Sequence, residues 1–146
     1  MGADVDLNNV DVVKELTAWG KWYLDITKVD GFRLDAVKHI YHNARSDENP
    51  RFLRMFYDDM NQYYKGKGHT EDFYMIGEVL SDYQEVAPYY AGLPALFEFA
   101  FWYRLKYALN NNAGCYLAKD ILNQQQAYAS YRNDYIEATK LTNHDE

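Results

Sequence analysis

The feature that most constrains this fold is a regular alternation of short apolar runs with longer segments of helical pattern. Four runs predict strands: VDGFRLDA (29–36), DFYMIGEV (72–79), LPALFEFAF (93–101) and YIEATKLTNHDE (135–146). Helical spacing of apolar residues marks the segments 10–27, 46–68, 101–110 and 115–132. Because strands that alternate with helices form parallel βαβ units, the sequence predicts an α/β fold. Either a small open sheet or a segment of a larger barrel fits this pattern.

Helix ends support these assignments. Asn8 or Asn9 is a candidate cap for the first helix. In the second helix, Asn49 is the candidate cap and Pro50 stands at the first helical position. The basic, glycine-broken stretch Lys65–Gly68 should end that helix.

Composition excludes several classes of protein. The 146 residues suit one ordinary domain, and 48% of them are hydrophobic, enough for a core. A formal net charge of −7 argues against nucleic acid as a partner, because phosphates would repel such a surface. No apolar run approaches the ~20 residues that cross a bilayer. The single cysteine, Cys115, excludes an internal disulfide and is expected to be a buried or semi-buried small apolar residue.

Candidate catalytic residues stand at the carboxyl ends of three predicted strands, where α/β barrels build their active sites. A period of two places Arg33 and Asp35 on one face of the first strand, so the guanidinium should favour the ionised carboxylate. Glu78 follows the apolar run YMIG, and partial desolvation should raise its pKa. His144 and Asp145 end the fourth run.

Two carboxylates in opposite electrostatic settings match glycoside hydrolysis, in which one acid attacks the sugar and the other protonates the leaving oxygen. Each feature taken singly also fits a structural role. Arg33 and Asp35 could be a structural ion pair, Glu78 a solvated acid at a strand end, and His144–Asp145 a turn. Their joint occurrence at successive strand ends favours the catalytic interpretation.

Four motifs in this order resemble the α-amylase family, glycoside hydrolase family 13: GADVDLNN, DGFRLDAVKH, IGEV and TNHD. The resemblance implies a partial (β/α)8 TIM barrel that holds about strands four to seven with their helices. The whole of 1–146 would then be a fragment of the catalytic barrel, domain A, with residues 1–9 at the junction with domain B.

The resemblance also implies a role for each matching residue. Asp35 corresponds to the nucleophile, Glu78 to the general acid/base and Asp145 to the third acid, which grips sugar hydroxyls. The remaining matches bind substrate: Arg33 orients the nucleophile, His144 lies beside the third acid, and Lys38 and His39 line the subsites on the leaving-group side.

The family's calcium ion lies between the barrel and domain B. The carbonyl oxygen of His39 matches one of its ligands. Asp4 fits a second ligand by its distance from the nucleophile, whereas Asp6 fits better by local motif, and we prefer Asp4. The alternative is that both acids are solvated loop carboxylates. An oxygen-only ligand set suits calcium.

For the parent protein the resemblance implies retaining endo-hydrolysis of α-1,4-glucosidic bonds in starch and malto-oligosaccharides, at a secreted or outer-membrane location. One rival is another family activity, such as a transglycosylase or a cyclodextrin or pullulan hydrolase. A second rival is a non-catalytic glucan-binding scaffold, although such relatives usually lose a catalytic acid. The isolated fragment should be inactive or very weak. Its unpaired barrel edges should favour self-association.

Overall fold

The computed structural model describes residues 5–41 and 47–140. Within them a single parallel sheet has the order β1-β2-β3-β4, so neighbouring strands in the sequence are also neighbours in space. The strands are β1 (Gly31–Leu34), β2 (Tyr74–Gly77), β3 (Ala95–Glu98) and β4 (Ile136–Thr139). All four coincide with the predicted apolar runs, and their all-parallel pairing confirms the α/β prediction.

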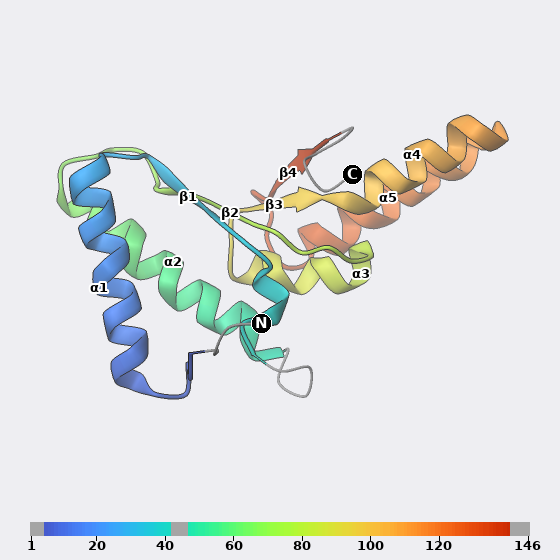
Figure 1. Cartoon of the computed structure of the whole chain (residues 1–146). Coiled ribbons are helices and arrows are strands. Elements are labelled where there is room, and N and C mark those ends of the chain that lie inside the picture. The colour runs from blue at the N-terminus through green and yellow to red at the C-terminus, as the bar shows by residue number, and fades with distance from the viewer. Residues whose placement is uncertain (1–4, 42–46, 141–146) are drawn as a thin grey trace.

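Helices connect successive strands, as parallel pairing requires. The long helices are α1 (Val10–Thr27), α2 (Asn49–Gly66), α4 (Phe99–Asn111) and α5 (Gly114–Ala129). The short elements are η1 (Val37–His39), α3 (Tyr83–Val86) and η3 (Ala87–Ala91). Figure 1 shows α1 and α2 at one end of the molecule and the α4–α5 hairpin projecting from the other.

The ends of α1 follow from local chemistry. The Asn9 side chain accepts a hydrogen bond from the backbone N–H of Asp11, which confirms Asn9 as the cap. At the other end Lys28 adopts a left-handed conformation with φ of 58°, and its N–H donates to the carbonyl oxygen of Leu24. This left-handed residue turns the chain into β1.

The start of α2 corrects one prediction. Asn49 is already the first helical residue, the cap position belongs to Glu48, and no side chain caps the helix. The Asn49 amide forms tertiary hydrogen bonds instead, to the turn after β1 and to η3. Pro50 stands in the first turn and α2 ends at Gly66, both as predicted.

The core lies between α2, the sheet and the segment that contains α3 and η3. Helix α2 contributes buried side chains at intervals of three and four residues: Leu53, Tyr57, Met60 and Tyr64. Strand β2 is buried along most of its length, as expected of a strand in the interior of a parallel sheet. The short helices over residues 83–91 were not predicted, although the capping residue Asp82 is a local signal for the start of α3.

Candidate active site

Asp35 and Glu78 are brought together by the pairing of β1 with β2. In this register Leu34 is the partner of Gly77, so the residue after each strand is one of the two acids. Pairing continues past the strand ends, because the Glu78 N–H donates to the Leu34 carbonyl oxygen at 2.9 Å. The predicted carboxyl-end placement of both acids is therefore confirmed.

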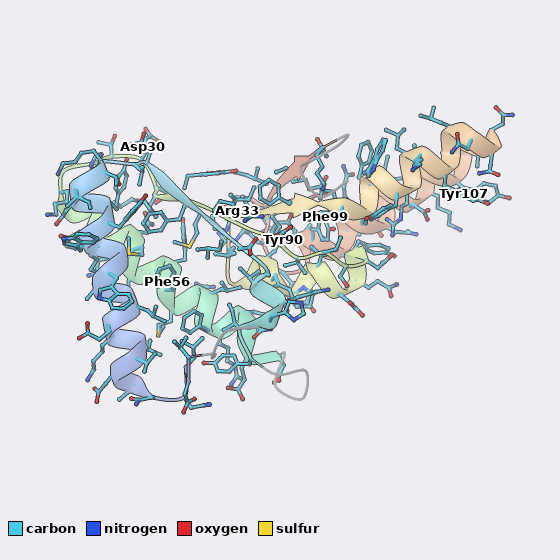
Figure 2. The ribbon with its side chains drawn as sticks, viewed as in Figure 1. Asp30, Arg33, Phe56, Tyr90, Phe99 and Tyr107 are labelled. Carbon is cyan, nitrogen blue, oxygen red and sulfur yellow. The ribbon has the colours of Figure 1, made fainter. Side chains whose placement is uncertain are left out.

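One guanidinium group joins the two acids. Nη1 of Arg33 donates to Oδ1 of Asp35 at 2.5 Å, and Nη2 donates to Oε2 of Glu78 at 2.8 Å. Because the planar guanidinium presents its donors in a fixed fork, these two bonds set the positions of the carboxylates relative to each other. Arg33 lies near the centre of the molecule, whereas Asp30 marks the opposite end of β1 (Figure 2).

The surroundings of the two acids differ in exposure. The side chain of Asp35 is 73% exposed and that of Glu78 is 14% exposed. The prediction that Arg33 accompanies Asp35 is confirmed. The predicted partial burial of Glu78 is confirmed, but its surroundings are not only apolar, because the same arginine binds it across the sheet. Sequence spacing could reveal the first contact but not the second, which joins residues 45 positions apart.

Phe97 is a further neighbour of Arg33. Its ring lies on β3, and the guanidinium carbon of Arg33 is 5.9 Å from the ring centroid, within the range of a cation–π contact. The guanidinium thus has a carboxylate at each terminal nitrogen and an aromatic ring nearby. The aromatic richness of the sequence gave no way to single out this ring.

The chain leaves β1 through a tight turn that carries Lys38 and His39. Ala36 has a φ of 46°, an uncommon conformation for a residue with a side chain, and it leads directly into η1. The Lys38 ammonium donates to the carbonyl oxygen of Leu80 at 2.6 Å, which ties this turn to the loop after Glu78. Lys38 and His39 also line an open pocket of about 820 Å³.

Three predicted site residues, Asp4, His144 and Asp145, lie outside the described residues. Over 5–41 and 47–140 no group of three or more His, Cys, Asp or Glu side chains could hold a metal ion. Cys115 is exposed, so the prediction that it is buried or semi-buried is wrong.

The carboxyl end of β3 carries a further acid, Glu98, whose environment differs from those of Asp35 and Glu78. Glu98 is 1% exposed, its Oε2 accepts from the Tyr128 hydroxyl at 2.6 Å, and its Oε1 accepts from the Phe101 N–H at the start of α4. Burial raises the pKa of Glu98, and the bond from Tyr128 opposes that rise. Glu98 is the last residue of β3 and its side chain caps α4, so we assign it a structural role.

Comparison with known proteins identifies the family. The model of the α-amylase catalytic domain matches residues 2–146. This chain belongs to the α-amylase family. The α-amylase SusG of Bacteroides thetaiotaomicron is 76% identical over 118 residues, which are 81% of this chain and 17% of that protein. α-Amylase 3 of Dictyoglomus thermophilum is 29% identical over 98% of this chain and 27% of its own length.

A solved amylase shares the fold. The crystal structure of α-amylase from H. orenii superposes with a TM-score of 0.81 and 27% sequence identity, over 98% of this chain and 28% of that one. The parallel sheet and its helices therefore form part of an amylase TIM barrel. This α-amylase-family chain spans between a sixth and just over a quarter of these relatives, at 17%, 27% and 28% of their lengths.

Proposed function

We propose that the whole protein is a retaining hydrolase that cleaves α-1,4-glucosidic bonds within starch and malto-oligosaccharides. The observation that carries this proposal is the bridge formed by Arg33 between Asp35 and Glu78. Carboxylates bound to the two terminal nitrogens of one guanidinium are close enough to act on the same sugar. Family membership and the name of the 76% identical relative point to the same reaction.

The two acids divide the reaction between them. Asp35 attacks the anomeric carbon and forms a covalent glycosyl-enzyme intermediate, while Glu78 donates its proton to the glycosidic oxygen, which leaves with the released chain. Glu78 then accepts a proton from water, and the resulting attack releases the sugar with its original anomeric configuration. Arg33 holds the Asp35 carboxylate for attack. Asp145 and His144 bind the sugar hydroxyls in this proposal, and Lys38 and His39 bind the leaving-group side.

Substitution of the nucleophile tests the proposal. In the whole protein Asp35→Asn should lower starch hydrolysis at least about 10⁴-fold, because the amide cannot form the covalent intermediate, while malto-oligosaccharide binding stays close to wild type. Asp30→Asn is the matched control, since Asp30 lies at the opposite end of β1, where it accepts a hydrogen bond from Tyr64. That variant should keep its activity.

The products provide an independent check. NMR of the first product released from maltoheptaose should show the α-anomer, as retention requires. Release of the β-anomer, or starch hydrolysis retained by Asp35→Asn, would exclude this mechanism. Malto-oligosaccharide binding without any hydrolysis by the wild-type protein would favour a glucan-binding scaffold.

We propose that the whole protein also holds a structural calcium ion through the carboxylate of Asp4 and the carbonyl oxygen of His39. Both donors are oxygen atoms, which fit calcium, and the ion would stabilise the junction beside η1. Calcium takes six to eight oxygen ligands, so the remaining ones would come from other parts of the protein and from water. Removal of calcium with a chelator should lower the melting temperature, and Asp4→Asn should weaken calcium binding.

We also propose that the isolated chain self-associates through the outer edges of β1 and β4. Within the described residues each of these strands pairs with a single neighbour. Trp19 and Trp22 line an open pocket together with Phe32 of β1 and are 63% and 61% exposed, which gives a second copy an apolar surface to cover. Sedimentation equilibrium should detect dimers that Trp22→Lys weakens and that Tyr107→Lys, at the tip of the α4–α5 hairpin, leaves intact (Figure 2). A concentration-independent monomer would refute this.

We propose a location outside the cytoplasm, secreted or attached to the outer membrane, because starch is a large polymer that is hydrolysed where it is encountered, outside the cell. Over 5–41 and 47–140 no helix is long and apolar enough to span a membrane. Fractionation of the producing cells tests the location, and activity confined to the cytoplasm would refute it.

A further inference from the structure

The side chain of Asn49 is completely buried and connects three separate segments. Its Nδ2 donates to the carbonyl oxygen of Lys38 at 2.9 Å and to the hydroxyl oxygen of Tyr89 at 3.1 Å. Its Oδ1 accepts from the backbone N–H of Tyr41 at 2.9 Å. The residue stands at the start of α2 with 0% exposure, yet it does not cap that helix.

The three hydrogen bonds use both N–H donors of the amide and its oxygen. A buried polar group left without a partner costs about 1–3 kcal/mol, so each of these bonds restricts where its partner can lie. No other side chain of the same size supplies two donors and an acceptor in this arrangement. Aspartate would keep the acceptor and lose both donors, and leucine would lose all three bonds.

The two backbone groups that Asn49 holds lie on either side of His39. One is the carbonyl oxygen of Lys38, in the peptide that joins Lys38 to His39, and the other is the N–H of Tyr41. The Asn49 side chain therefore holds the turn that carries Lys38 and His39 at both of its ends. Because the Lys38 ammonium also binds the carbonyl oxygen of Leu80, the same turn supports the loop that follows Glu78.

Tyr89 completes the arrangement from η3. It is 6% exposed, and burial raises the pKa of its hydroxyl group, so the hydroxyl stays protonated and neutral. Its oxygen can then accept from Asn49 without placing a charge in the core. Lys38, His39, Pro50 and Tyr89 all line the open pocket beside the turn, so the buried hydrogen bonds lie at its wall.

We propose that Asn49, supported by Tyr89, is a positioning residue that sets how firmly the enzyme holds the leaving-group side of its substrate. Asn49 does not touch the sugar; it acts through the turn that presents Lys38 and His39. This inference rests on the proposed glucan hydrolysis. It predicts that loss of the amide weakens binding beyond the cleaved bond and leaves the chemistry at Asp35 and Glu78 intact.

The test compares two substrates in the whole protein. For maltoheptaose, which extends past the cleaved bond, Asn49→Ala should raise KM by about 10-fold, equivalent to ~1.4 kcal/mol of lost binding. For a short malto-oligosaccharide with a nitrophenyl leaving group, kcat/KM should change less than about two-fold, because an activated leaving group needs little binding. Tyr89→Phe, which removes one of the three bonds, should give a smaller shift of the same kind.

Gln124→Ala is the matched control. Gln124 is 2% exposed and its amide also binds two polar partners, Arg104 and Glu137, but it lies on α5 and makes none of the contacts at the turn. It should lower stability by a similar amount and leave the KM for maltoheptaose unchanged. An equal KM rise in Gln124→Ala would overturn the inference. So would an Asn49→Ala variant that loses activity equally on both substrates or not at all.

Hydrogen exchange separates this inference from the proposed function. In Asn49→Ala the Tyr41 amide proton should exchange at least about 10-fold faster than in wild type, while Gln124→Ala should leave it protected. A wild-type protein inactive on every glucan would refute the proposed function alone, and exchange at Tyr41 would still show whether Asn49 holds the turn that carries Lys38 and His39. Unchanged exchange at Tyr41 in Asn49→Ala would refute that role of Asn49.

Discussion

The buried hydrogen bond from Tyr128 to Glu98 should have a free energy that depends on pH. The Tyr128 hydroxyl lies 2.6 Å from Oε2 of Glu98, and the two side chains are 0% and 1% exposed. Burial raises the pKa of Glu98 above its ordinary value of 4.5, and the hydrogen bond from Tyr128 is the strongest influence in the opposite direction. Tyr128→Phe removes that influence, so the pKa of Glu98 should rise further.

The sign follows from proton linkage. A carboxyl whose pKa is raised by folding binds protons more tightly in the folded state, so stability falls as pH rises above 4.5 through the folded pKa. Below 4.5 the carboxyl of the folded state is largely neutral because its pKa is raised, and the variant should lose only an ordinary hydrogen bond, about 0.5–1.5 kcal/mol. Above the folded pKa the lost bond is to a carboxylate, and the loss should reach about 1.5–3 kcal/mol.

Urea unfolding followed by circular dichroism measures this difference. Wild type and Tyr128→Phe would be compared at about pH 4 and about pH 7, so that titrating groups that do not interact with Glu98 cancel in the difference. Tyr90→Phe is the control, since its ring packs 4.7 Å from that of Tyr128 and its hydroxyl donates to the neutral carbonyl oxygen of Ile136. The control should lose the same stability at both pH values. An equal loss for Tyr128→Phe at both pH values would refute the reasoning.

Two further predictions concern the site and the core. Arg33→Lys should lower kcat/KM for starch by about 10- to 100-fold, because one ammonium cannot replace a fork that binds two carboxylates; wild-type activity would refute the bridging role. Gly92→Ala should destabilise the chain by about 1–3 kcal/mol in urea unfolding, because the new Cβ would lie 2.5 Å from the carbonyl oxygen of Pro50. Gly66→Ala is the control, since its Cβ would meet nothing within 4 Å, and a comparable loss there would count against a steric cause.

The strands and long helices could be predicted because their signals are local. The period of two that pairs Arg33 with Asp35 is visible within five residues, and the cap at Asn9 is visible within three. Asn49 shows where such reasoning stops. Its type and its place before Pro50 suggest a cap, but Tyr89, one of its actual partners, is 40 residues away. A local sequence pattern contains no information about a hydrogen-bond partner that is distant in the sequence and comes close only in the folded chain.

The candidate site was predictable to the same extent. Each acid could be placed at a strand end, and the resemblance supplied its role. The contact between Arg33 and Glu78, and the ring of Phe97 beside the guanidinium, both depend on the pairing of separate strands. The short helices over 83–91 were missed because they hold too few turns to show helical periodicity.

The register of β1 against β2 decides whether the two acids can meet. A Cβ at Gly77 would lie 2.6 Å from a methyl group of Leu93 and 3.1 Å from one of Leu96, so this residue faces the apolar core. Since side chains alternate along a strand, Glu78 must face the opposite way, the side on which Arg33 binds it. A slip of one residue would turn Glu78 into the core and replace it with an apolar neighbour. The tight packing around Gly77 therefore fixes the register, and the register brings both carboxylates to one guanidinium.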